Sequence, residues 1–186
     1  RKGKKRTYAS SVVCRQRLSR SEATPHRSQA RGCQQCDAAR SEAAIKTLAA
    51  DIGGYAVPMD LTDPNSIESA VTEVEANVGE ISILVNNAGI AHASPIESLE
   101  VEDFDRLIGV HLRGTFLCTR SALRMMYGQN SGRIINTASQ LAYIGAPGFS
   151  HYTAAEGAIL SFTRSLALEI GDRPITANCV APGATM

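Results

Sequence analysis

Short apolar runs alternate with longer segments of helical periodicity from residue 41 to the end of the chain. The runs predict strands, and they cover residues 55–59, 81–85, 133–138 and 175–180. Between them, apolar residues recur every three or four positions, which predicts helices over residues 41–51, 63–78, 101–126 and 152–170. Because strands joined by helices run parallel, this alternation predicts an α/β fold built on a doubly wound parallel sheet.

The composition is that of one globular domain. A chain of 186 residues is long enough to bury a substantial core. Hydrophobic residues make up 44% of it and charged residues 20%, which excludes a disordered or fibrous protein. No apolar run approaches the roughly 20 residues of a membrane span, and the N-terminus lacks the apolar core of a signal peptide. We therefore expect no membrane partner and a cytoplasmic location.

Charge is distributed unevenly along the chain. Residues 1–40 contain eleven Lys or Arg and two acidic residues, a net charge of +9, whereas residues 41–186 contain eight basic and sixteen acidic residues, a net charge of −8. Residues 1–36 also lack a sustained period of 2 or 3.6, although residues 8–14 fit a weak strand. We therefore divide the chain into a basic, irregular segment of unassigned status at 1–36 and a domain at 37–186.

The N-terminal segment contains two further patterns. Its basic residues 1–6 are compatible with an arm that binds nucleic acid by releasing counterions from phosphate. Tyr8 is the only aromatic residue available there for base stacking, so we expect no nucleic-acid partner. Cys33 and Cys36 have the spacing of a zinc or redox pair, but no second pair and no HxxxH follows, so we expect no metal site.

Polar and glycine-containing segments follow the predicted strands. Open parallel sheets bind their ligands at the carboxyl ends of the strands, where these ends meet at one edge. The segments at that edge are Asp60, residues 86–89 (Asn-Asn-Ala-Gly), Ser139, Tyr152 at the start of the next helix, and residues 182–183 (Pro-Gly). We therefore expect these residues to lie close together and to form the functional site.

In this order and spacing, the segments resemble the short-chain dehydrogenase/reductase superfamily. The resemblance covers roughly residues 37–186 and is carried by Asp60-Leu61-Thr62, the Asn-Asn-Ala-Gly at 86–89, Ser139, Tyr152 thirteen residues later, and residues 178–183 (Asn-Cys-Val-Ala-Pro-Gly). Each motif alone is weak, but five in family order make coincidence a poor explanation. The chain looks most like bacterial reductases of the 3-oxoacyl-acyl-carrier-protein type or the sugar and alcohol dehydrogenase type, which the sequence does not separate.

The resemblance implies a Rossmann-like fold and hydride transfer between NAD or NADP and a small carbonyl or alcohol substrate. In the family, the Tyr at position 152 is the general acid/base, and the Ser at position 139 hydrogen-bonds the substrate oxygen. The implied cofactor-binding residues are Asp37, Asp60, Leu61, Asn87, Ala88, Gly89, Tyr152, Pro182 and Gly183. The resemblance also implies a homodimer or homotetramer formed through the helices predicted at 101–126 and 152–170.

The sequence departs from the family at two catalytic positions. Glu156 occupies the position of a Lys that holds the nicotinamide ribose and lowers the pKa of the Tyr, and His111 occupies the position of an Asn in the proton relay. A phenol titrates at about 10 unless a nearby cation stabilises the phenolate. A carboxylate one helical turn away raises the pKa of Tyr152 instead, so we expect impaired dehydrogenase activity.

The family pattern is also incomplete at both ends of the chain. Family members begin with a strand and a glycine-rich TGxxxGxG turn that approaches the cofactor pyrophosphate, whereas residues 1–36 contain only Gly3 and Gly32. Family members continue past the Pro-Gly turn with a substrate-covering helix and a last strand, which are not recognisable before Met186. We therefore expect a truncated domain, and a reading-frame shift upstream of Asp37 is one hypothesis for the change in composition.

Two functions follow from these observations. The first is an NAD(P)-dependent oxidoreductase whose activity is impaired by Glu156 and His111. The alternative is a non-catalytic relative that retains at most weak nucleotide binding or a contact between subunits.

Overall fold

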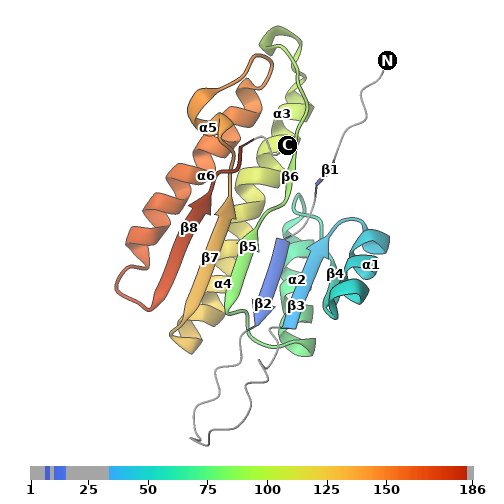
Figure 1. Ribbon diagram of the computed structural model, residues 1–186, viewed down its shortest axis with the longest axis vertical. Helices are drawn as coiled ribbons and strands as arrows, with labels where there is room; N and C mark the ends of the chain where they lie inside the picture. The colour runs from blue at the N-terminus through green and yellow to red at the C-terminus, as the bar shows by residue number, and fades with distance from the viewer. Residues whose placement is uncertain (1–6, 9–10, 16–33, 184–186) are drawn as a thin grey trace, which may run out of the picture.

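A computed structural model describes residues 7–8, 11–15 and 34–183 of the chain. Its centre is a six-stranded sheet with the strand order β4-β3-β2-β5-β7-β8 (Figure 1). These strands are β2 (Ser11–Arg15), β3 (Gln34–Ala39), β4 (Tyr55–Pro58), β5 (Ile83–Asn86), β7 (Gly132–Thr137) and β8 (Ile175–Val180). A separate pair joins β1 (Thr7–Tyr8) to β6 (Gly89–Ile90). The four strands predicted from apolar runs are confirmed to within about two residues.

Helices lie between the strands, as the periodicity predicted. They are α1 (Glu42–Ile52), α2 (Pro64–Asn77), α3 (Val101–Ile108), α4 (Gly114–Gln129), α5 (Leu141–Ile144) and α6 (Ser150–Glu169), with a short 3-10 turn, η1 (Ile96–Ser98). Helix α2 begins where the sequence indicated, because the Asp63 side chain accepts a hydrogen bond from the Asn65 N–H at 2.9 Å and Pro64 supplies the first helical residue. None of the helices in the described part of the chain is both long and apolar enough to span a membrane.

The long helix expected over residues 101–126 is interrupted at its centre. Between α3 and α4 lies η2 (Gly109–Arg113), one turn of π-helix in which the Gly114 N–H bonds to the Gly109 carbonyl. Such a turn inserts an extra residue into the helix, and it commonly occurs at functional sites because it redirects one side chain. The redirected segment contains His111, which is buried.

Strand β2 lies between β3 and β5 in the sheet, and its direction was not predicted. Three pairs of strands are parallel, namely β3 with β4, β5 with β7, and β7 with β8. In contrast, β2 runs antiparallel to both of its neighbours, so that Val12 lies opposite Asp37 in β3 and Val85 in β5. This strand lies near the centre of the sheet, and it covers most of the weak strand predicted at 8–14. The fold is Rossmann-like, but it is not parallel throughout.

The segment at 1–36 is described only in part. Strands β1, β2 and the beginning of β3 lie in it. The division of the chain between residues 36 and 37 stays a prediction. The weak strand expected at 8–14 corresponds to the end of β1 and most of β2. The interpretations of residues 1–6, Gly3, Gly32 and Cys33 concern residues outside the described part of the chain.

The main core lies between the sheet and helices α2, α4 and α6. It joins apolar side chains of β4, β5, β7 and β8 to those helices, and its fully buried members include Val57, Ile67, Ala122, Met126, Ile134 and Ile170. In Figure 1, α4 is seen behind β5 and β7. Fully burying one large apolar side chain, such as Ile134 or Met126, stabilises the fold by about 1.5–3 kcal/mol, and this burial fixes the strands whose ends form the site.

A buried polar ladder crosses the sheet beneath that edge. The Asn86 side-chain amide donates to Asn136 Oδ1 at 2.9 Å and lies 3.1 Å from Thr119 Oγ1 on α4. The Asn136 amide in turn donates to Thr163 Oγ1 on α6 at 2.9 Å. Because buried amides are costly without partners, these bonds hold β5 and β7 in register at the point where the Asn-Asn-Ala-Gly turn begins.

We predict that Asn136→Ala lowers the free energy of unfolding by about 2–4 kcal/mol, because it removes one buried hydrogen bond from Asn86 and one from Thr163 and leaves a small cavity. Asn178→Ala is the matched control, since Asn178 is exposed on the neighbouring strand β8 and should change stability by less than about 0.5 kcal/mol. Urea denaturation measures both variants. Equal effects of the two substitutions would contradict a stabilising role for the ladder.

Candidate functional site

The carboxyl ends of β3, β4, β5, β7 and β8 meet at the upper edge of the sheet in Figure 1. Asp60 lies two residues after β4, and Ser139 lies two residues after β7. The turn at 86–89 ends β5, and Pro182 follows β8, where its carbonyl accepts a hydrogen bond from the Gln140 N–H at 3.0 Å. The edge therefore collects the segments that the sequence singled out.

Ser139 and Tyr152 lie together at this edge. Tyr152 is in the first turn of α6 and is half-buried, and its phenol forms a hydrogen bond with the Ser139 hydroxyl. The Ser139 oxygen also accepts the Leu141 N–H at 3.2 Å, which fixes its position at the start of α5. The Tyr152 ring packs edge-on against Phe149 and His111, with ring centroids 6.0 and 5.6 Å apart.

Glu156 and His111 contact each other directly. Glu156 lies one helical turn after Tyr152, and its Oε1 is 2.6 Å from Nδ1 of His111. Each side chain is only 3% exposed. The two positions at which the sequence departs from the family are therefore one buried pair, although 45 residues separate them in the chain.

The second nitrogen of His111 binds the backbone of the turn after β5. Its Nε2 accepts a hydrogen bond from the Ile90 N–H at 2.8 Å, which leaves the ring proton on Nδ1, where it is donated to Glu156. The Ile90 carbonyl is 2.9 Å from the same nitrogen. The ring also lies so close to Gly89 that a Cβ there would be 2.9 Å from Cε1 of His111, so only glycine fits.

The environment of Tyr152 favours its protonated form. Burial raises the pKa of the phenol, and the charge of the Glu156 carboxylate raises it further, whereas the hydrogen bond with Ser139 lowers it. The net direction is upward, as expected for a carboxylate one helical turn away. A hollow of about 460 Å³ opens beside this group and is lined by Asn87, Ala88, Gly89, Ile90, Ala91, His111, Thr137, Ala138, Tyr152 and Glu156.

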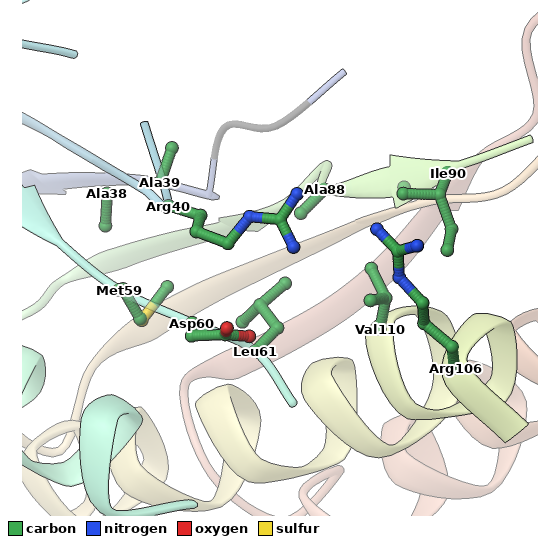
Figure 2. Close-up of a pocket in the computed structure, with 11 residues that line it drawn as sticks. Ala38, Ala39, Arg40, Met59, Asp60, Leu61, Ala88, Ile90, Arg106 and Val110 are labelled. Atoms are coloured by element: carbon green, nitrogen blue, oxygen red, sulfur yellow. The ribbon is translucent and has the colours of Figure 1, made fainter. Parts of the chain in front are cut away.

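A second hollow, of about 430 Å³, lies on the other side of the turn after β5 (Figure 2). It is lined by Ala38, Ala39, Arg40, Met59, Asp60, Leu61, Ala88, Gly89, Ile90, Arg106 and Val110. The Asp60 carboxylate accepts hydrogen bonds from the Thr62 N–H at 2.9 Å and the Thr62 hydroxyl at 2.7 Å. These bonds, together with the charges of Arg40 and Arg106, lower the pKa of Asp60, so it is ionised at neutral pH.

The sequence-predicted site residues divide between these hollows. Asp60 and Leu61 line the second hollow, Asn87 lines the first, and Ala88 and Gly89 line both. Pro182 and Gly183 line neither of them, and a Cβ on Gly183 would lie 2.7 Å from the side-chain oxygen of Gln140.

Two residues that line the second hollow, Arg40 and Arg106, were not predicted from the sequence. The resemblance implied Asp37 as a cofactor-binding residue, but Asp37 lies within β3, two residues before its end, and Arg40 is the first residue after that strand. The rule that functional residues follow strands therefore pointed to Arg40. Arg106 lies on α3, and nothing in its local sequence distinguishes it from other charged residues on that helix.

The arrangement contains a phenol, a hydroxyl and a buried imidazole–carboxylate pair, which can hold and move a proton at a substrate oxygen. Among the residues that the structure describes, no three His, Cys, Asp or Glu side chains are grouped closely enough to hold a metal ion.

Comparison with known proteins agrees with this geometry. Residues 22–186 match the sequence profile of the family described as short chain dehydrogenase. Over 156 residues, the chain is 35% identical to the 3-oxoacyl-acyl-carrier-protein reductase FabG of Salmonella typhimurium, and the alignment covers 83% of this chain and 64% of that protein. The chain thus spans about 64% of the length of this relative.

Two solved structures share the fold. The 3-ketoacyl-(acyl-carrier-protein) reductase of Brucella melitensis, complexed with NADH, superimposes with a TM-score of 0.78 at 32% identity, covering 80% of this chain and 64% of that one. The gluconate 5-dehydrogenase of Burkholderia cenocepacia, in complex with NADP and tartrate, has a TM-score of 0.74 at 33% identity and covers 80% and 60% of the two chains. By its sequence profile and its fold, this chain belongs to the short-chain dehydrogenase family.

Proposed function

We propose that this chain binds NAD(P) at the carboxyl edge of its sheet and that its capacity for hydride transfer is strongly reduced near neutral pH. The observation that carries the proposal is the 2.6 Å contact between Glu156 and His111. This pair occupies two family positions that normally hold a Lys and an Asn, and it offers no free cation to stabilise a phenolate at Tyr152. The cytoplasmic location expected from the sequence stays a prediction.

The shape of the edge supports nucleotide binding. The two hollows adjoin at Ala88, Gly89 and Ile90, so an elongated ligand can occupy both. The second hollow has apolar walls suited to a purine ring, and its ionised Asp60 can accept a hydrogen bond from an amino group. The sequence contains no glycine-rich turn for the pyrophosphate, and we therefore propose weaker binding than is usual for such a site.

The residues around Tyr152 support a slow reaction. A nicotinamide cofactor, when bound, supplies or accepts the hydride. Tyr152 must then donate or remove the proton at the substrate oxygen, while Ser139 orients that oxygen. A phenol whose pKa is raised is a weaker acid, and its phenolate forms only at higher pH, so proton transfer slows in both directions near neutral pH. The substrate class we propose is a small carbonyl or alcohol compound.

We propose a second role that does not require turnover, a contact between subunits through α4 and α6. Phe116 and Tyr127 on α4 are 43% and 40% exposed, and Leu168 on α6 is 84% exposed. Arg120 lies over the Phe116 ring at 5.4 Å. Exposed aromatic and apolar side chains beside an Arg are typical of the centre of a protein interface, and a homodimer or homotetramer would bury them.

The first prediction concerns the pKa of Tyr152. Glu156→Gln removes the carboxylate charge, so the pKa of Tyr152 should fall, and the double variant Glu156→Lys with His111→Asn should lower it further by adding a cation. The pKa of Tyr152 is measured by following tyrosinate absorbance in the ultraviolet as the pH rises. Subtracting the titration of Tyr152→Phe isolates the signal of this one phenol. Glu169→Lys, on the exposed end of α6, is the charge-matched control and should leave the pKa unchanged. An unchanged titration in the double variant would refute the proposed electrostatic effect.

The second prediction concerns turnover. The double variant should oxidise gluconate or reduce a 3-oxoacyl thioester roughly 100-fold faster than the unmodified chain at neutral pH, because Tyr152 regains acid/base function. Alcohol oxidation should also reach its plateau at a lower pH. Glu156→Lys alone should gain less, because its buried ammonium would face the His111 ring. If the double variant folds and binds cofactor but turns over neither gluconate nor the 3-oxoacyl thioester faster than the unmodified chain, the reaction proposed for this site is contradicted.

The third prediction concerns assembly. Phe116→Asp combined with Leu168→Asp should convert a dimer or tetramer to monomers, because each change places a charge in the buried centre of the contact. Analytical ultracentrifugation measures the mass. Ile144→Asp is the control, since Ile144 is 71% exposed and lies on α5, which is not one of the two helices of the proposed contact. A monomeric unmodified chain would exclude the contact.

A further inference from the structure

The pair formed by Glu156 and His111 carries one negative charge. Nε2 of His111 accepts the Ile90 N–H, so the imidazole holds a single proton, on Nδ1, and is neutral. That proton is donated across 2.6 Å to Glu156, which accepts it as a carboxylate. In the described part of the chain, His111 is the only basic side chain within ion-pair distance of this carboxylate.

This charge lies at the wall of the first hollow. Glu156 and His111 both line it, and each side chain is almost entirely buried, so little water screens the carboxylate. Among the described residues that line this hollow, none is a Lys or an Arg. The first hollow therefore presents a negative charge without a positive one to balance it.

Two neighbouring groups respond to the carboxylate. Burial is the main cause that raises the pKa of the Tyr152 phenol and of the Cys179 thiol, and the charge of Glu156 raises both further. Ionisation of either group would add a second negative charge beside the first, whereas a cation placed there would be attracted. The surroundings of Glu156 thus favour a positively charged ligand.

We propose that the first hollow is a cation site, and that it binds the oxidised nicotinamide ring, which is positively charged, in preference to the reduced ring, which is neutral. The inference rests on the proposed nucleotide site and adds the oxidation state that the site selects. A buried carboxylate without a cationic partner is unfavourable, and a planar cation beside it offsets that cost. An opposite charge within about 4–6 Å changes an ionisation equilibrium by about tenfold or more, and the same attraction acts on a bound cation.

The preference is a property of the residue at position 156 in this chain. A Lys, which the family has at this position, would repel a cationic ring, whereas Glu156 attracts it. His111 does not reverse the effect, because its neutral ring only donates a hydrogen bond to the carboxylate. The exchange of Lys for Glu therefore inverts the charge that faces the ligand.

Calorimetry on the unmodified chain tests the preference. The probes are NAD⁺ with NADH and NADP⁺ with NADPH, because only the nicotinamide ring changes within each pair. ADP, which lacks that ring, is the reference for binding at the second hollow. We expect the oxidised form to bind at least about tenfold more tightly than the reduced form in each pair that binds.

The variant Glu156→Gln assigns the preference to the carboxylate. The Gln oxygen still accepts the His111 proton, so the substitution removes the charge and keeps the hydrogen bond. The ratio of the two affinities should fall to within about threefold of unity, and the affinity for ADP should stay the same. Thermal unfolding checks that the variant is folded.

Two controls remove a carboxylate elsewhere. Glu169→Gln, at the exposed end of α6, should keep the ratio of the unmodified chain. Asp60→Asn removes the carboxylate of the second hollow, so it should change the affinities for the oxidised and reduced forms by the same factor and leave their ratio unchanged.

The outcomes separate this inference from the proposed function. Equal affinities for the oxidised and reduced forms in the unmodified chain overturn the cation site and leave the nucleotide site in place, and this comparison decides even if Glu156→Gln does not fold. A preference that persists in folded Glu156→Gln overturns the role of the carboxylate. A preference that Asp60→Asn abolishes overturns the assignment to the first hollow. If neither the dinucleotides nor ADP bind, the proposed function and the cation site are both wrong.

Discussion

The hydrogen bond between Glu156 and His111, two side chains that are almost entirely buried, joins three elements. It connects α6 to the π-helical turn η2, and through Nε2 of His111 it reaches the backbone at Ile90. A buried carboxylate without a partner is strongly unfavourable, so neither residue is replaceable alone at low cost. The position of the turn after β5, and with it the boundary between the two hollows, depends on this pair.

Much of the fold was predictable because the pattern that defines it is local. The apolar runs at β4, β5, β7 and β8 and the periodic segments between them identify an α/β sheet, and Asp63-Pro64 fixes the start of α2. The candidate site was predictable in part, since the segments after parallel strands meet at one edge whatever their sequence separation. Asp60, Ser139 and Tyr152 were therefore found from their order along the chain.

The remainder depends on contacts that local sequence does not encode. Nothing near Ser11–Arg15 indicates a strand at the sheet centre that runs against its neighbours. The contact between His111 and Glu156 arises because η2 turns the imidazole toward α6, and the periodicity predicted one uninterrupted helix there. Asp37 was implied only by the resemblance to a family, whereas the end of β3 places Arg40 at the second hollow.

The direction of β2 also determines how negative charge can be held at the functional edge. A parallel central strand would leave the sheet at that edge and lead into a helix whose first N–H groups face the ligand. Because β2 is antiparallel, the chain enters it there and leaves from the opposite edge. No helix therefore follows β2 at this edge, and the cationic side chains that line it, Arg40 and Arg106, supply positive charge that this strand does not. Anion binding through these side chains is weakened by salt, so the occupancy of this edge should depend on the ionic strength around the protein.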